Sequence, residues 1–168
     1  MTTPCRDSFA RAPASVYARP RRLSSYFSYA LGGTTAGGAA GFLAARPPRD
    51  WERIARYGER LRFSAGDAVV RLGETDTSFG IVLSGSLVVE IPTRPRIEAG
   101  SVFGELAFLT SAPRSATVRA EEDGEMLRLS RDGFDVLGAR HPELGRSIAL
   151  ELGRIVAERL QRENERQR

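Results

Sequence analysis

Fold and function are both indicated by one segment, residues 103–117, which reads FGELAFLTSAPRSAT. Gly104 and Glu105 precede a short apolar helical turn, and a helix start attracts anions because its first backbone N–H groups are unpaired. Gly104 also lets the backbone approach an anion closely. Arg114 adds a planar guanidinium that can hold two phosphate oxygens, and Ser115 adds a hydroxyl donor. The segment therefore predicts a phosphate-binding loop.

Glu105 has a different expected role from that of Arg114. A carboxylate repels a phosphate, so we expect Glu105 to accept a hydrogen bond from a sugar hydroxyl. The alternative is a structural ion pair between Glu105 and Arg114, with the apolar residues between them serving only as core.

The order of residues 103–117 closely resembles the phosphate-binding cassette of cyclic-nucleotide-binding domains, the cAMP and cGMP sensor modules of kinase regulatory subunits, gated channels and the catabolite activator protein. The resemblance implies that Glu105 binds the ribose 2′-hydroxyl and Arg114 the cyclic phosphate. It also implies a set of ligand-binding residues: Gly104, Glu105, Leu106, Ala107, Arg114, Ser115 and Ala116. The implied ligand is cAMP, with cGMP as the alternative, and no other cofactor is expected.

Short apolar or alternating segments separated by glycines surround this cassette. Strands this short, with a turn signal about every 8–12 residues, favour an antiparallel barrel or jelly roll. The expected fold is mainly β with flanking helices: a jelly-roll barrel, a short N-terminal helix, a cassette helix and two C-terminal helices. The expected strands are residues 60–63, 68–72, 79–83, 87–91, 117–120 and 125–129. Glycines 66, 73, 85 and 100 recur in the order seen in the family, which extends the resemblance from Trp51 to the C-terminus.

Helices are expected on both sides of the barrel. Asp50 is a good N-cap after two prolines, so residues 50–57 should form a short helix. Ser130 is expected to cap a helix at 131–140. Pro142 suits the first turn of a longer helix at 142–161, after which the polar end should fray.

This long C-terminal helix carries an apolar stripe at helical spacing. Its members are Leu144, Ile148, Leu152, Ile155, Val156 and Leu160. The favoured interpretation is packing onto the barrel. The alternatives are a helix that pairs in a homodimer or contacts an effector protein, and a lid that swings onto the bound base, as the resemblance suggests.

Residues 1–48 lack periodicity and are rich in proline, glycine and alanine, which is typical of a flexible or disordered leader. A twin-arginine or organellar targeting signal and an early start codon are the alternatives. We expect deletion of residues 1–46 to leave ligand affinity unchanged. The expected domains are the leader at 1–48, the barrel with its flanking helices at 49–140, and the C-terminal helix at 141–168.

Composition excludes several classes of function. The chain has 168 residues and a net charge of +4, but residues 1–50 hold seven Arg and two Asp (+5), which leaves −1 for the rest. The folded part thus lacks the basic patch of a nucleic-acid-binding protein. Cys5 is the only cysteine and His141 the only histidine, so neither a disulfide nor a histidine-rich metal site is expected. We expect a cytoplasmic protein without a membrane span, and a capping or surface role for His141.

The sequence departs from the family pattern at three places, and two of them, the hairpin and Ser115, bear on the ligand. The hairpin at residues 92–96 is short, which affects the expected contacts to the base. Gly80 stands where a bulky residue is usual. Ser115 replaces the threonine that favours guanine in some relatives, so cAMP is preferred.

Four functions compete. A non-catalytic cyclic-nucleotide sensor is favoured, and the runner-up is a jelly-roll module that has lost its ligand and acts in oligomerisation or docking. A cupin-type metalloenzyme needs a histidine cluster that is missing. A transcription factor of the catabolite-activator type needs a helix-turn-helix after the long helix, where this sequence ends.

Overall fold

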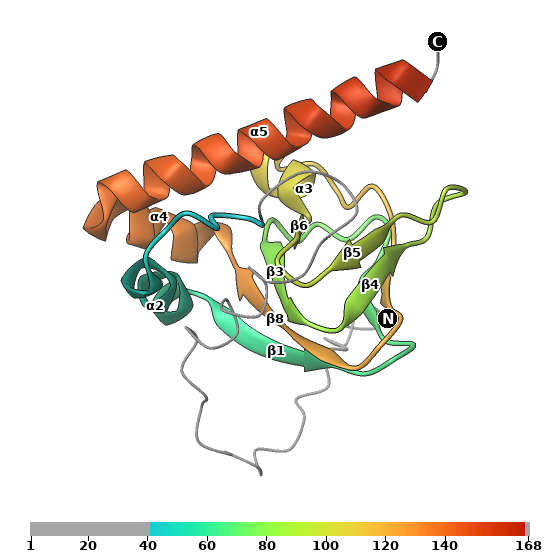
Figure 1. Ribbon diagram of the computed structural model, residues 1–168, viewed down its shortest axis with the longest axis horizontal. Helices are drawn as coiled ribbons and strands as arrows, with labels where there is room; N and C mark the ends of the chain where they lie inside the picture. The colour runs from blue at the N-terminus through green and yellow to red at the C-terminus, as the bar shows by residue number, and fades with distance from the viewer. Residues whose placement is uncertain (1–40, 167–168) are drawn as a thin grey trace, which may run out of the picture.

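The computed structural model describes residues 41–166, and within that range eight strands form two four-stranded antiparallel sheets (Figure 1). One sheet has the strand order β1-β8-β3-β6, and the other has the order β2-β7-β4-β5. The strands are β1 (Glu59–Phe63), β2 (Ala68–Val70), β3 (Phe79–Ser84), β4 (Ser86–Val89), β5 (Arg96–Glu98), β6 (Val102–Phe103), β7 (Val118–Ala120) and β8 (Gly124–Leu129). The predicted class, mainly β with a jelly-roll arrangement, is confirmed.

The strands expected from the sequence are all present, with their ends shifted by one or two residues. Strand β2 ends at Val70 rather than at residue 72, and β4 ends at Val89 rather than at residue 91. Strands β5 and β6 were not expected. They complete the sheets beside the cassette, because β5 pairs with β4 and β6 pairs with β3.

Strand β3 lies at the centre of the molecule and is buried on both faces. Phe79, Ile81 and Leu83 pack into a core shared with the helices. Val82 points to the other face and packs into the core between the two sheets. Burial on both faces explains why this strand reads as a continuous apolar run rather than as an alternating one.

Gly80, also on β3, accounts for one departure from the family pattern. A Cβ atom added at Gly80 would overlap the ring of Phe103. Phe103 is buried in the core between the sheets and pairs directly with Gly80 in the β3–β6 ladder. The Phe103 ring therefore fills the space that a side chain at position 80 would need.

Helices cover one face of the sheet that contains β3. They are α2 (Pro48–Tyr57), α3 (Glu105–Thr110), α4 (Arg131–Arg140) and α5 (Pro142–Arg166). Figure 1 shows α5 running the length of the molecule above α3 and α4. An aromatic contact joins the cassette helix to the barrel, because the rings of Phe79 and Phe108 meet edge to face with centroids 4.9 Å apart.

The helix ends correct one prediction and confirm another. The prediction that Asp50 caps α2 is wrong: the helix begins at Pro48, whose missing N–H costs nothing in the first turn. Asp50 lies inside that turn, buried, and forms ion pairs with Arg53 (3.1 Å) and Arg46 (3.4 Å). Ser130 does cap α4, since its Oγ accepts a hydrogen bond from the Gly133 N–H at 3.1 Å.

Residues 41–46 correct the expected leader at its C-terminal end. Phe42 and Leu43 are buried in the core shared by the helices and the barrel. The Phe42 N–H donates to the Gly100 carbonyl oxygen at 3.0 Å, and Arg46 Nη2 donates to Ser147 Oγ on α5 at 2.9 Å. This segment is therefore a packed strap rather than part of a flexible leader. Residues 1–40, and with them the expected targeting alternatives, lie outside the described residues.

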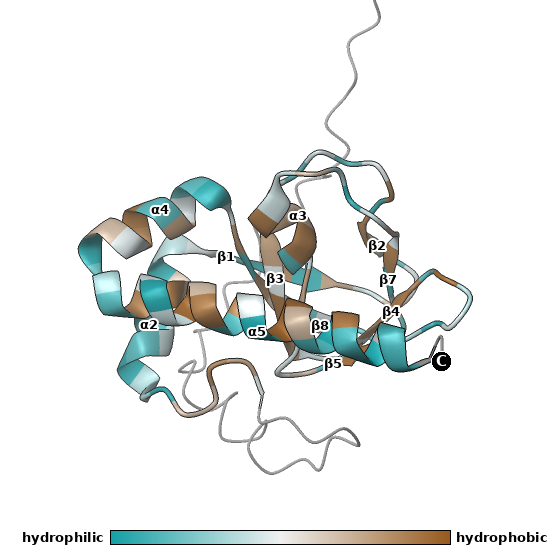
Figure 2. Cartoon of the chain, turned by 90° about the horizontal axis from the view of Figure 1, so that it is seen from above, coloured by the Kyte–Doolittle hydropathy of each residue, from teal (hydrophilic) through white to brown (hydrophobic). Residues whose placement is uncertain are grey.

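Helix α5 divides into two parts by packing. Leu144, Ile148 and Leu152 are buried against the barrel, which confirms the favoured packing for the first half of the stripe. Leu160, farther along, is 61% exposed, and the helix continues to Arg166 rather than fraying after residue 161. Figure 2 shows hydrophilic turns alternating with apolar ones along this helix. Within residues 41–166, no helix combines the length and the apolar character needed to cross a bilayer.

Candidate ligand-binding site

Gly104 connects strand β6 to the cassette helix α3. It is the N-cap residue and has the left-handed backbone conformation, with φ 77° and ψ 7°, which favours glycine. A Cβ atom at this position would also overlap Arg114 Nη1 and would lie 3.2 Å from the Ser78 carbonyl oxygen. Two independent constraints, backbone conformation and close packing against Arg114, thus require glycine here.

Arg114 is held by groups that the sequence did not identify. Its side chain is buried, with Nη2 donating to Asp76 Oδ2 at 2.6 Å and to Ser78 Oγ at 3.1 Å. Nη1 donates to the Gly104 carbonyl oxygen at 3.2 Å. Nε is buried and has no hydrogen-bond partner among the described residues. The Nε–H of the guanidinium is therefore a buried donor that no described residue accepts from.

Asp76 is ionised in this arrangement. Burial alone would raise the pKa of its carboxyl group, but hydrogen bonds from Ser78 and Arg114 and the Arg114 charge outweigh burial. The pKa of Asp76 therefore lies below its ordinary value. Asp76 and Arg114 therefore form an ion pair at neutral pH.

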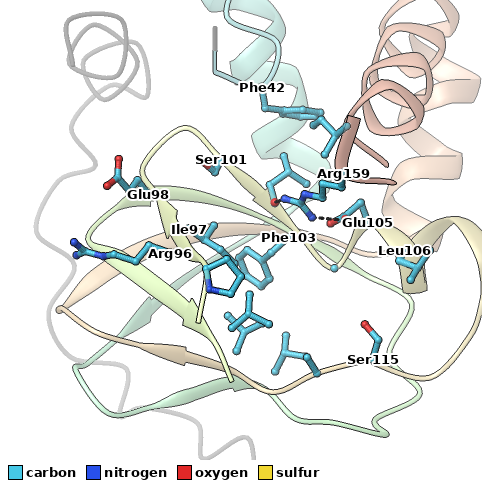
Figure 3. A pocket seen from close by; sticks show the side chains of 18 of the residues that line it. Phe42, Arg96, Ile97, Glu98, Ser101, Phe103, Glu105, Leu106, Ser115 and Arg159 are labelled. Carbon is cyan, nitrogen blue, oxygen red and sulfur yellow. Dashed lines mark hydrogen bonds and ion pairs between the residues drawn. The ribbon is translucent and has the colours of Figure 1, made fainter. Parts of the chain in front are cut away.

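Glu105 contacts the C-terminal helix. It is 6% exposed, and its Oε1 accepts a hydrogen bond from Arg159 Nη1 on α5 (Figure 3). Arg159 Nη2 also donates to the Val102 carbonyl oxygen at 2.8 Å. The second carboxylate oxygen, Oε2, is buried without a partner among the described residues. The alternative interpretation, a direct ion pair between Glu105 and Arg114, is wrong for the described residues, in which Arg114 pairs with Asp76 and Glu105 with Arg159.

A cavity of about 650 Å³ brings these groups together. All of the predicted ligand-binding residues line it: Gly104, Glu105, Leu106, Ala107, Arg114, Ser115 and Ala116. Its volume is in the range of small-molecule sites. Figure 3 shows Phe103 and Ile97 on one side of the cavity, and Glu105 and Arg159 on another. The cavity thus has an apolar part and a charged part.

A metal centre finds no support in the part of the chain that the structure covers. No group of three His, Cys, Asp or Glu side chains there could hold an ion. His141 is the C-cap residue of α4, and its carbonyl oxygen accepts from the N–H groups of Leu144 and Gly145, both at 3.0 Å. These bonds use the backbone of His141, so the expected capping or surface role of its side chain stays a prediction.

Comparison with known proteins assigns the central part of the chain to a family. Residues 60–141 match the family model described as the cyclic nucleotide-binding domain. This part of the chain belongs to that family. The solved cyclic nucleotide-binding domain from Methylobacillus flagellatus has the same fold, with a TM-score of 0.67 over 86% of this chain and 81% of that chain, at 19% identity.

Curated relatives carry such a domain within longer chains. A cyclic nucleotide-gated potassium channel from Rhizobium etli is 34% identical over 85 residues, which is 50% of this chain and 24% of the channel. A cAMP-dependent protein kinase regulatory subunit from Emericella nidulans is 33% identical over 97 residues, which is 55% of this chain and 23% of that subunit. The chain thus spans about a quarter of the length of each relative.

The short hairpin of this cyclic nucleotide-binding domain still reaches the cavity. Ile91, Thr93 and Pro95 line it, together with Ile97 on β5. The turn is closed by backbone bonds, because the Val89 N–H donates to the Pro95 carbonyl oxygen at 3.0 Å. The shortened segment therefore keeps apolar side chains on the cavity wall.

Sequence reasoning missed the residues of this cyclic nucleotide-binding domain that are far from the cassette in the sequence but lie beside it in the fold. Asp76 and Ser78 precede β3 in a polar stretch without a motif. Arg159 is one of several arginines on α5, and only the alternative lid role of that helix pointed towards it. Gly41 and Phe42 line the cavity from a segment that was taken for a flexible leader.

Proposed function

We propose that this chain is a non-catalytic sensor that binds a cyclic nucleotide, preferably cAMP, in the cavity between the cassette and α5. The observation that carries the proposal is a pair of buried polar atoms without partners among the described residues, Arg114 Nε and Glu105 Oε2. They belong to two residues that line one cavity. One is a cationic donor and the other an anionic acceptor, and unsatisfied buried groups of this kind are costly unless a ligand pairs with them.

A cyclic nucleotide offers complementary groups. Its phosphate can accept from Arg114 Nε and from Ser115, and a ribose hydroxyl can donate to Glu105 Oε2. The base can then contact the apolar wall formed by residues such as Val89 and Ile97. The preference for cAMP is supported by Ser115 in place of threonine, and by the name of the cAMP-dependent kinase relative. A cytoplasmic location is part of the same proposal.

Helix α5 is the proposed route of the signal to an effector protein or to a second copy of the chain. Arg159 on α5 already holds Glu105 Oε1 and the Val102 carbonyl oxygen. A ligand hydroxyl that donates to the same carboxylate changes the strength of the Arg159 contact. Binding can shift the position of α5 only if the ligand has different affinities for the two arrangements.

The main alternative also has a specific observation in its favour. Arg114 and Glu105 each have an ion-pair partner within the chain, Asp76 and Arg159. These pairs would suit a module that has lost its ligand and acts in oligomerisation or docking.

Thermal unfolding with added nucleotide separates the two functions. A ligand present at 100 times its dissociation constant stabilises the folded state by about 2.7 kcal/mol. We expect cAMP to raise the unfolding temperature, cGMP to raise it less at equal concentration, and the linear nucleotide 5′-AMP to have the smallest effect. If none of the three nucleotides raises the unfolding temperature up to millimolar concentration, the docking module is the better interpretation.

Replacing Arg159 with alanine tests the route of the signal. In the wild-type protein, cAMP is expected to change the hydrogen-exchange protection of α5, and in Arg159→Ala this change should be reduced because the link to Glu105 is gone. Arg146→Ala is the matched control, because Arg146 lies on the same helix in an exposed pair with Glu143 and does not line the cavity. An equal change in α5 protection in all three proteins would contradict a signal through Arg159.

A further inference from the structure

The charged end of the cavity is electrically balanced before any ligand arrives. Arg114 pairs with Asp76, and Arg159 pairs with Glu105. Two positive and two negative groups therefore stand together on or just behind the cavity wall. An incoming anion adds its whole charge beside two ion pairs whose own charges already cancel.

Of these four charged residues, Asp76 is the one that contacts Arg114 from outside the cavity. It does not line the cavity, yet its Oδ2 lies 2.6 Å from Arg114 Nη2. Ser78 Oγ donates to the same Oδ2 at 2.6 Å and accepts from Arg114 Nη2 at 3.1 Å. This arrangement fixes the orientation of the guanidinium and offsets part of its charge, while Nε stays unused.

Among the described residues that line the cavity, Arg114 is the only cationic residue in its loop. The other arginines of that lining are Arg96 on β5 and Arg154, Arg159 and Arg162 on α5. Arg96 and Arg154 are paired with Glu121 and Glu151, both at 2.7 Å. Arg162 is exposed near the end of α5, where its Nε donates to the Glu158 carbonyl oxygen at 3.3 Å.

The affinity of this site for a phosphate is therefore expected to depend on how many negative charges the phosphate carries. A cyclic phosphate is a diester with one negative charge. Hydrolysis of the ring adds water across one P–O bond and leaves a free ribose hydroxyl and a monoester. The monoester carries about two negative charges above its second pKa of about 6. When the monoester phosphate binds Arg114, its second negative charge lies near the Asp76 carboxylate on the same guanidinium and is repelled by it. Such repulsion between like charges at a binding site selects against the wrong ligand.

We propose that Asp76 is a specificity-determining residue that makes the site accept a singly charged cyclic phosphodiester and reject the doubly charged monoester formed by its hydrolysis. This inference rests on the proposed function and extends it. It gives Asp76 a role in selecting the ligand in addition to orienting Arg114. The sensor then responds to the intact cyclic nucleotide and not to its hydrolysis product.

Substitution of Asp76 tests the inference through a ratio of affinities. The affinities of cAMP and 5′-AMP are measured by calorimetry for the wild type, Asp76→Asn and Asp76→Glu. Removing one negative charge helps a dianion about twice as much as a monoanion, so Asp76→Asn should improve 5′-AMP relative to cAMP by about tenfold. Asp76→Glu keeps the charge and should keep the wild-type ratio. Asp132→Asn, which removes an exposed charge on α4 away from the cavity lining, is the control.

A measurement on the wild-type protein alone gives a second test. At pH 5 the 5′-AMP phosphate is mostly a monoanion and at pH 7.5 mostly a dianion, so the affinity of 5′-AMP relative to that of cAMP should fall by about tenfold between them. Asp76 stays ionised throughout, because Ser78 and Arg114 in the loops and Arg128 on β8 hold its pKa below the ordinary value. His141 is the histidine of the chain and is distant from the cassette loop in sequence. The cAMP titration at both pH values corrects for any effect of its protonation.

The outcomes separate the two claims. A larger relative affinity for 5′-AMP in Asp76→Asn, together with the fall of 5′-AMP affinity with pH in the wild type, supports the inference. If the wild type binds cAMP but both ratios stay constant, the role of Asp76 is refuted and the proposed function stands. If the wild type binds neither nucleotide, the proposed function fails and this inference fails with it.

Discussion

Replacing Arg114 with leucine is expected to abolish cAMP binding in calorimetry. The substitution leaves the cyclic phosphate without its cation in a partly buried site, which by analogy with broken buried ion pairs costs about 3–5 kcal/mol. That loss corresponds to a decrease in affinity of about 10²- to 10³-fold or more. The same substitution removes the bonds from Arg114 to Asp76, Ser78 and the Gly104 carbonyl oxygen, so folding of the variant must be checked by thermal unfolding.

Two further variants make this result specific. Arg114→Lys keeps the charge but loses the fork that reaches several oxygens at once, so it should bind cAMP more weakly than the wild type and better than Arg114→Leu. Arg119→Leu is the matched control, because Arg119 forms an exposed pair with Glu90 at 2.6 Å and does not line the cavity. Wild-type affinity in a folded Arg114→Leu protein would refute the role given to Arg114.

Deleting residues 1–46 is expected to destabilise the domain by at least about 3–5 kcal/mol, the usual cost of removing one buried phenylalanine side chain. The deletion removes Phe42 and Leu43 from the core, and the Arg46 contact to Ser147 on α5. The sequence alone predicted no effect of this deletion on ligand affinity. We now expect weaker binding as well, because Gly41 and Phe42 line the cavity.

A shorter deletion provides the control for the strap. Deletion of residues 1–40 keeps every contact of the described residues, so urea unfolding of this variant should give a free energy of unfolding at least about 3 kcal/mol higher than that of the longer deletion. Phe42→Ala should reproduce most of the loss, and Leu72→Ala, at a side chain that is 67% exposed, should change little. Equal stability of the two truncated proteins would contradict the packing role of residues 41–46.

Local signals in the sequence were sufficient for the cassette and for most strands. Gly104, Glu105 and Arg114 lie within one short segment, and the roles predicted for them follow from the chemistry of neighbouring groups and from the resemblance to the family. Strands β5 and β6 have three and two residues, which is too short for an alternating pattern to appear. In β5 a single buried residue, Ile97, stands between two charged ones.

Contacts between distant parts of the chain were beyond sequence reasoning. Asp76 and Arg114 are 38 positions apart, and Glu105 and Arg159 are 54 apart. Only the folded barrel brings the loop before β3 and the far half of α5 to the cassette. The strap at residues 41–46 was missed for a related reason, because two apolar residues, Phe42 and Leu43, show no period until the core around them is known.

A crystal structure of the full chain with cAMP tests the central claim most directly. The account predicts one nucleotide per chain in the cavity lined by the cassette and α5. Its cyclic phosphate should lie within hydrogen-bond distance of Arg114 and Ser115, and a ribose hydroxyl should donate to Glu105. A nucleotide bound elsewhere, or bound in this cavity with its phosphate away from Arg114, would contradict the account.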